Sequence, residues 1–206
     1  GKYDAHFQKF VEWQYRKLKS KGFIYKGLHP VVYDPTVNKV IGDHDRPDEY
    51  GGISYIEGYV IKFETEVKNL KVYLPCFTLR PETVLGVTNI WINPNTKYLI
   101  CKVNDEYWIL PDSIVIEELK GQGFEVEIVE EIDAKEILLK NAKNLVNNEI
   151  VPILPAEFVD TEIGTGIVMS VPAHAPYDYI GLKDLLKTEY REIATKCLEN
   201  MKSLFK

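Results

Sequence analysis

The sequence is poor in features that would place it outside the ordinary globular class. Its only cysteines, Cys76, Cys101 and Cys197, are odd in number and widely spaced. That spacing argues against a disulfide framework or a zinc knuckle and indicates reduced thiols. No apolar run approaches the roughly 20 residues that a membrane helix needs, and no signal peptide is visible. We therefore expect a cytoplasmic protein with no membrane segment.

An excess of basic residues is also missing. Lysine and arginine number 25 against 31 aspartates and glutamates, which gives a net charge of −6. This balance argues against a general nucleic-acid-binding protein, but it allows local recognition of one single-stranded end. The 206 residues are 45% hydrophobic and 27% charged, which fits one domain with a real core over residues 1–206. Because the chain starts with Gly1, we expect a fragment of a longer polypeptide.

The apolar periodicity predicts short strands that alternate with helices of uneven length. Asp133 and Glu136 have the spacing of a capping box at a helix start, and Asn104-Asp105 is typical of a hairpin turn. This pattern predicts a mixed α/β domain around a compact, barrel-like sheet. The predicted helices cover 4–20, 111–121, 133–147 and the chain from 180 onward, and the predicted strands cover 59–67, 71–77, 97–103, 107–110, 125–129 and 163–171.

Two separated segments carry the residues that indicate chemistry. Thr78-Leu79-Arg80-Pro81-Glu82-Thr83 places hydroxyls around one arginine directly after an apolar run. The segment 164–179 is a glycine-rich apolar run that ends in proline, histidine and the carboxylate of Asp178. Brought together, they would form a small apolar pocket with hydroxyls on one wall and one anionic group on the other. Such a pocket suits a small aliphatic amino acid with a free ammonium group.

Both segments resemble the editing (CP1) domain of class I aminoacyl-tRNA synthetases, and the archaeal and eukaryotic leucyl type in particular. The resemblance lies in Thr-Leu-Arg-Pro-Glu-Thr-Val-Leu-Gly-Val-Thr-Asn-Ile-Trp at 78–91 and Val-Pro-Ala-His-Ala-Pro-Tyr-Asp at 171–178. Trp13-Gln14-Tyr15 and the run 42–46 are similar to the flanking sequence. The resemblance implies a barrel-centred domain that is inserted into a Rossmann catalytic domain and is covalently part of a larger, monomeric synthetase.

The chain lacks the His-Ile-Gly-His-type and Lys-Met-Ser-Lys-Ser-type motifs that bind ATP in class I synthetases. The resemblance therefore implies ATP and Mg²⁺ for the parent enzyme and no cofactor for this fragment. Many relatives carry cysteine pairs near the equivalent of residues 34–39, and this sequence has none there. The run Gly42-Asp43-His44-Asp45 fits a polar loop better than a metal site, so we expect no metal.

The resemblance implies hydrolysis of the ester that joins a wrong amino acid to the terminal adenosine of tRNA(Leu). The noncognate amino acid would be isoleucine, valine, methionine or a similar residue. One methylene is worth about 1–3 kcal/mol in an apolar pocket, so a second, hydrolytic selection step is needed for accuracy. The acidic net charge predicts that the fragment alone binds tRNA weakly.

The resemblance places the universal aspartate of the family at Asp178, which would bind the substrate ammonium; the alternative is a helix N-cap. Thr83 would exclude leucine through its stiff β-branched side chain, or be an ordinary loop threonine. Thr78 would hold the attacking water or the ester carbonyl. These three residues form the predicted catalytic set.

Four further residues are predicted to bind substrate. Arg80 would contact the ribose or phosphate of the terminal adenosine, or form a structural pair with Glu82. Met169 and Val171 alternate on one strand and would line the side-chain pocket, with core packing as the alternative. His174 would position groups, since no carboxylate near it in sequence completes a triad.

Two other functions stay open. The first is a non-catalytic module that binds the 3′ end of tRNA or a free amino acid, which the acidic charge and the lack of an obvious base favour mildly. The second is the editing domain of a valyl- or isoleucyl-tRNA synthetase, although valyl enzymes tend to read Thr-Thr-Arg-Pro-Glu-Thr at the first segment.

Overall fold

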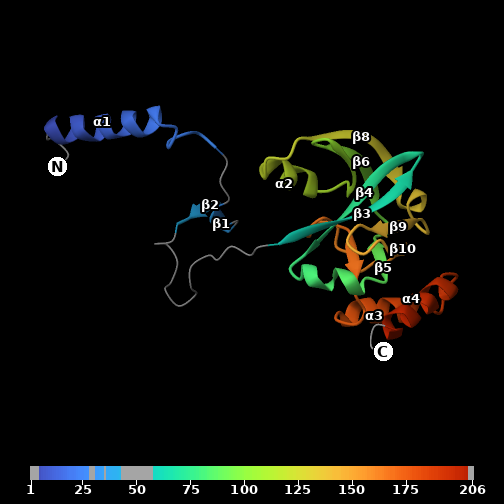
Figure 1. Ribbon diagram of the computed structural model, residues 1–206. Coiled ribbons are helices and arrows are strands. Elements are labelled where there is room, and N and C mark those ends of the chain that lie inside the picture. The colour runs from blue at the N-terminus through green and yellow to red at the C-terminus, as the bar shows by residue number, and fades with distance from the viewer. Residues whose placement is uncertain (1–4, 28–30, 35, 43–57, 204–206) are drawn as a thin grey trace. The chain divides into compact units, whose positions relative to one another are not determined.

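The computed structural model describes residues 5–27, 31–34, 36–42 and 58–203 (Figure 1). The chain divides into two compact units, Gly1–Ser54 and Tyr55–Lys206. The run 43–46, which the resemblance included, and the candidate metal residues Asp43, His44 and Asp45 lie outside the described residues. That residues 1–206 form one editing domain stays a prediction.

The first unit contains helix α1 (Ala5–Ser20) and an antiparallel pair, β1 (Val32–Asp34) with β2 (Lys39–Ile41). The helix matches its predicted range, and Gly22 follows its end with φ +76° and donates its N–H to the Lys19 carbonyl at 3.1 Å. Positive φ is a conformation that glycine adopts without strain, so Gly22 is a natural helix terminator. Within this unit, the apolar residues of the helix are exposed.

The second unit is built on a nine-stranded mixed sheet with the order β11-β5-β10-β9-β3-β4-β7-β6-β8. Most neighbours are antiparallel, while β10 with β5 and β4 with β7 are parallel. The sheet confirms the predicted mixed α/β class. The strands are β3 (Tyr59–Val67), β4 (Leu70–Thr78), β5 (Asn89–Ile92), β6 (Lys97–Val103), β7 (Glu106–Pro111), β8 (Val126–Asp133), β9 (Asn141–Asn144), β10 (Ile150–Pro155) and β11 (Val168–Ser170).

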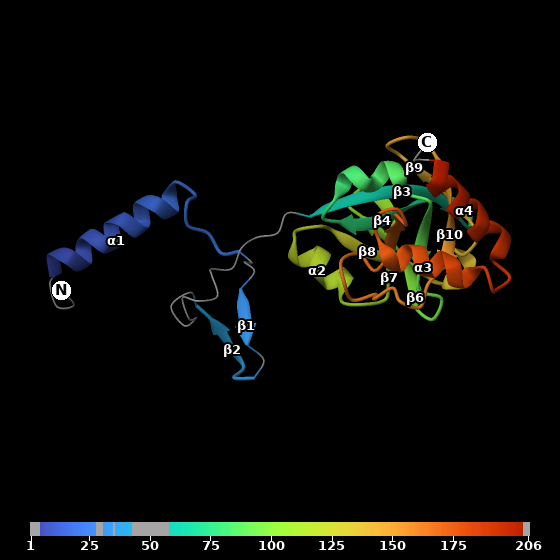
Figure 2. The ribbon, with the colours of Figure 1, turned by 90° about the horizontal axis from the view of Figure 1, so that it is seen from below.

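The helices of this unit lie at the two ends of the sheet (Figures 1 and 2). Helix α2 (Val115–Gly121) lies at one end, and α3 (Pro176–Leu185) and α4 (Arg191–Ser203) pack together at the other. Two 3₁₀ turns, η3 (Pro81–Gly86) and η4 (Ala134–Glu136), complete the elements. Within the described residues, we find no helix that is both long and apolar enough to cross a membrane.

The sheet curls, so that edge strand β11 comes close to β4, which is a central strand of the same sheet. The curled sheet encloses the main apolar core, with Phe63, Leu74, Ile90 and Ile153 fully buried. Each such side chain contributes about 1.5–3 kcal/mol by burial. A second apolar cluster lies between the sheet and α3–α4, and Trp91 and Leu182 belong to it. Strand β5 is therefore buried on both faces.

The predicted helix over 133–147 is wrong. Asp133 and Glu136 do form the reciprocal capping box, but it begins only the single turn η4. The chain then turns and forms β9, which pairs with β10 and β3 and buries Ala142 and Asn144. A capping box supplies local hydrogen bonds at a helix start, and sheet pairing outweighs it here.

Three other predicted boundaries change. The helix after Pro111 starts only at Val115, and the strand predicted at 125–129 extends to Asp133. The predicted C-terminal helix begins earlier, at Pro176, and is interrupted between Leu185 and Arg191. All three cysteines are free, which agrees with the predicted reduced thiols, and all three are buried.

Candidate active site

The segment after β4 is shaped by hydrogen bonds between its own residues. The Thr78 hydroxyl accepts the Arg80 N–H at 3.0 Å. The Thr83 hydroxyl and N–H both donate to the Arg80 carbonyl, at 2.7 and 3.1 Å. Pro81 begins η3, where its fixed φ and missing N–H are compatible with the first turn. The two threonines therefore fix the backbone on either side of Arg80.

Arg80 and Glu82 form an ion pair, with 3.0 Å between Nε and Oε1 and more than half of each side chain exposed. The Glu82 pKa lies below its ordinary value, first because a backbone N–H bonds the carboxylate and then because of Arg80. His174 adds a smaller electrostatic lowering of the Glu82 pKa. A carboxyl with a depressed pKa is a weak proton acceptor, which agrees with the prediction of an ion-pair partner.

The second segment contacts the first through Thr165. Its buried hydroxyl accepts the Phe77 N–H at 3.0 Å and donates to the Ile167 carbonyl at 3.3 Å. Phe77 is adjacent to Thr78, so this hydroxyl joins the two segments. Gly164 has φ +65°, and a Cβ there would meet the Phe77 Cβ at 3.1 Å. The glycine thus allows the backbone to come close to Phe77.

The predicted strand over 163–171 is mostly wrong, since β11 covers only Val168–Ser170. Turns with positive φ at Gly164 and Gly166 occupy its first part. Met169 and Val171 do share one face, as predicted, and both are buried in the main core with Val84 of η3. This packing brings the two segments against one another, and it is also the core packing that was the alternative for Met169.

Asp178 is a buried carboxylate, with the residue only 6% exposed. Its Oδ1 accepts the Trp91 indole N–H at 3.0 Å, and its Oδ2 accepts the Val171 N–H at 2.7 Å. The alternative of a helix N-cap is wrong, because Ala175 is the N-cap of α3 and Asp178 lies in its first turn. Burial raises the pKa of Asp178 above its ordinary value, and the two hydrogen bonds oppose that rise.

His174 is exposed at the end of the loop between β11 and α3, where its N–H donates to the Val171 carbonyl at 2.9 Å. Among the described residues, its ring is hydrogen-bonded to no carboxylate, and Glu82 is the carboxyl whose pKa it lowers electrostatically. The ring is therefore near enough to Glu82 to act on it electrostatically.

A cavity of about 560 Å³ lies at the end of β10 next to the α3–α4 connection. Ala156, Phe158, Gly181 and Leu185 contribute to its walls, while Thr78, Thr83 and Asp178 do not. The two predicted segments are in contact, as described above. Because Thr78, Thr83 and Asp178 do not line this cavity, it is not the pocket that was expected between the segments. Among the described residues, no group of three potential ligands could hold a metal ion.

Sequence reasoning did not assign roles to Trp91 and Thr165, which make the long-range hydrogen bonds of the site. A signal existed for Trp91, since a buried indole N–H needs an acceptor. No comparable signal existed for Thr165, because its partner Phe77 is 88 positions away.

Comparison with known proteins places this geometry in a family. The family model described as "Leucyl-tRNA synthetase, editing domain" matches residues 52–185. A leucine–tRNA ligase of Nanoarchaeum equitans is 40% identical over 304 residues, covering 99% of this chain and 31% of the relative. One of Aeropyrum pernix is 50% identical over 180 residues, covering 87% of this chain and 18% of the relative.

Solved structures agree with the sequence match. The crystal structure of GlLeuRS-CP1 is 32% identical with a TM-score of 0.59, covering 71% of this chain and 66% of that one. The chain belongs to the family of leucyl-tRNA synthetase editing domains. It spans less than a third of the length of the two curated relatives.

Proposed function

We propose that this domain hydrolyses the ester of mischarged tRNA(Leu), acting on the 3′ end that carries isoleucine, valine, methionine or a similar noncognate amino acid. It would do so as part of a larger leucine–tRNA ligase. The observation that carries the proposal is the juxtaposition of the two family segments, because Trp91 of the first donates its indole N–H to Asp178 of the second at 3.0 Å. Family membership supports the same reaction.

Asp178 is the proposed ligand for the substrate ammonium. Each of its oxygens accepts one protein hydrogen bond, and a carboxylate oxygen has lone pairs for more than one. The surrounding burial strengthens the attraction between the carboxylate and an ammonium group. Because an ionised carboxylate is required, hydrolysis should decline as the pH falls through the raised pKa of Asp178.

The remaining residues have proposed roles near the ester. Thr78 holds the attacking water or the carbonyl, and Arg80, paired with Glu82, contacts the terminal adenosine. Thr83 restricts the space available to a γ-branched side chain. Met169 and Val171 form the apolar wall behind these groups, and His174 positions the nucleotide.

The experiment measures release of isoleucine from isoleucyl-tRNA(Leu) by the synthetase that contains this chain. Asp178→Ala should abolish release, a loss of at least about 100-fold, because a charge-assisted contact and a preorganised site are both removed. Leucylation by the same preparation serves as the folding control. Full hydrolytic activity in the variant would remove Asp178 from the reaction.

A second variant tests selectivity. Thr83→Ala should allow the domain to hydrolyse correctly charged leucyl-tRNA(Leu), because the side chain that excludes leucine is shortened. Unchanged protection of leucyl-tRNA would mean that another residue excludes leucine. Binding of the charged tRNA end without any ester turnover by the wild type would favour the non-catalytic module instead.

A further inference from the structure

Trp91 is a fully buried residue whose ring lies between the sheet and α3–α4. Phe158 packs edge-on against it, with 5.7 Å between ring centroids. A Cβ at Gly181 would meet the indole Cζ2 at 3.3 Å, so the backbone of α3 lies almost directly on the ring. Packing on several sides leaves the indole one orientation.

In that orientation the only polar group of the ring points at Asp178. The indole Nε1, which can only donate, lies 3.0 Å from Oδ1. Asp178 and Gly181 are three positions apart on α3 and share one helix face. The helix therefore contacts Trp91 at two points, through a carboxylate oxygen and through bare backbone.

The groups around this carboxylate are neutral in the part of the chain that the structure describes. The causes of its raised pKa are burial, opposed by the bonds from Val171 and Trp91. Cys197 of α4 belongs to the same cluster as Trp91, and burial raises its pKa to about 11, so the thiol is uncharged. The titratable residues nearest in sequence, Tyr177, Tyr179 and His174, are exposed.

We infer that Trp91 is a positioning residue for the hydrolysis, whose indole N–H orients the Asp178 carboxylate and favours its ionised form. The inference rests on the proposed function, in which Asp178 binds the substrate ammonium. A buried carboxylate without a cation of its own tends to take up a proton. A neutral donor counteracts that tendency without competing for the ammonium, as a lysine or arginine would.

The test compares Trp91→Phe with Trp108→Phe in the synthetase that contains this chain. Trp108 is a matched control, since it is 7% exposed and donates its Nε1–H to the Glu106 carboxylate at 2.9 Å. The measurement is kcat/KM for isoleucyl-tRNA(Leu) hydrolysis across pH. Trp91→Phe should move the acidic limb of the profile to higher pH and lower kcat/KM roughly tenfold on that limb, with a smaller loss above it. Trp108→Phe should leave the profile unchanged.

A second readout does not depend on activity. The carboxyl carbon of Asp178, followed by NMR during a pH titration, should titrate at higher pH in Trp91→Phe than in the wild type. If Trp91→Phe fails to fold, benzothienylalanine at position 91 keeps the ring size and removes only the donor. Either substitution should give the same shift.

The outcomes separate the two ideas. An inactive Asp178→Ala with an unchanged pH profile in Trp91→Phe would overturn the role of Trp91 and leave the proposed function intact. A fully active Asp178→Ala would overturn the proposed function, and the NMR titration would still show whether the indole controls the charge of Asp178. An equal shift in Trp91→Phe and Trp108→Phe would also overturn the inference.

Discussion

The domain contains two buried indoles that each donate to a carboxylate, and the pKa values of the two carboxyl groups are shifted in opposite directions. Trp91 donates to Asp178 at 3.0 Å, and Trp108 donates to Glu106 at 2.9 Å. The pKa of Asp178 is raised, first by burial. The pKa of Glu106 is lowered, first by its hydrogen bonds with Lys62. An indole donor alone therefore does not decide the charge of its acceptor.

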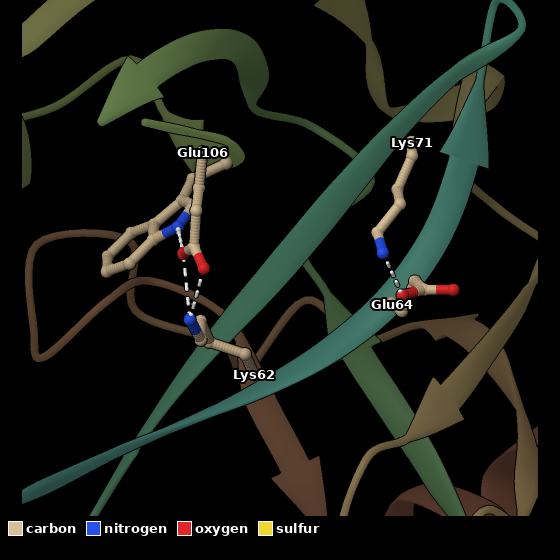
Figure 3. A network of polar contacts seen from close by, with 5 residues as sticks. Lys62, Glu64, Lys71 and Glu106 are labelled. Atoms are coloured by element: carbon tan, nitrogen blue, oxygen red, sulfur yellow. Dashed lines mark hydrogen bonds and ion pairs between the residues drawn. The ribbon is translucent and has the colours of Figure 1, made fainter. Parts of the chain in front are cut away.

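The difference arises from what else surrounds each carboxylate. Lys62 lies 2.7 Å from both oxygens of Glu106, on a face of the sheet where about a third of each side chain is exposed (Figure 3). Lys71 pairs with Glu64 at 2.7 Å on the same face. Glu106 thus already has its cation. Asp178 has only neutral donors among the described residues, which leaves it available to a cationic ligand.

The largest expected effect that sharpens this comparison concerns packing. Trp91→Ala should destabilise the domain by about 3–5 kcal/mol, because it removes a fully buried ring between two layers. Trp108→Ala should cost less, since that ring is 7% exposed and its surroundings can relax. Chemical denaturation of both variants measures the two free energies of unfolding. Equal losses would show that the two rings are held equivalently.

A smaller effect concerns the pH dependence of stability, which should have opposite signs at the two sites. For Glu106 the lowered pKa means that its contribution is present above pH 4.5 and is lost as pH falls through the folded pKa. For Asp178 the raised pKa means that stability is lost as pH rises from 3.8 through the folded pKa.

Unfolding measured between pH 3 and 7 tests these signs. Glu106→Gln should remove the gain with rising pH, at most about 1 kcal/mol because the pair is partly exposed. Asp178→Asn should remove the loss with rising pH, so that its deficit relative to the wild type shrinks. The difference in unfolding free energy between the wild type and each variant should change with pH in opposite directions at the two sites. A change in the same direction for both variants would contradict the comparison.

The smallest expected effect is that of salt. At 1 M salt the Debye length falls to about 3 Å, which weakens the partly exposed Lys62–Glu106 pair by a few tenths of a kcal/mol. The pKa of Glu106 should then rise toward its ordinary value, while that of Asp178 should stay constant. Carboxyl NMR titrations at 0.1 and 1 M salt measure both. A comparable response at Asp178 would indicate a nearby charge.

Local patterns predicted much of the fold. Strand β3 matches its predicted range 59–67, because its alternation is a local pattern, and β6 matches 97–103, because the turn signal at Asn104-Asp105 marks its end. The failures at 133–147 and 163–171 have a long-range cause. Asn144 donates its side-chain N–H to the Val84 carbonyl at 3.0 Å, and no local pattern encodes a contact 60 positions away.

In the candidate site, too, local features were predictable and long-range contacts were not. Its two segments were recognisable from residue order, and the structure shows that they touch. The partners that determine the charge of Asp178 were not predictable, because Trp91 lies 87 positions away. A resemblance can indicate which carboxylate matters, whereas its environment depends on how the sheet curls and how α3 packs.

The attachment of α3 has a consequence on heating. Asp178 is carried on a helix that is held to the sheet by the packing of Leu182 and by α4. Elements that are attached to a sheet through side-chain packing open locally at lower free energy than the strands of the core. Detachment of these two helices would separate the Asp178 carboxylate from Trp91 while the strands stay folded, so the candidate site would be lost at temperatures below the melting of the domain.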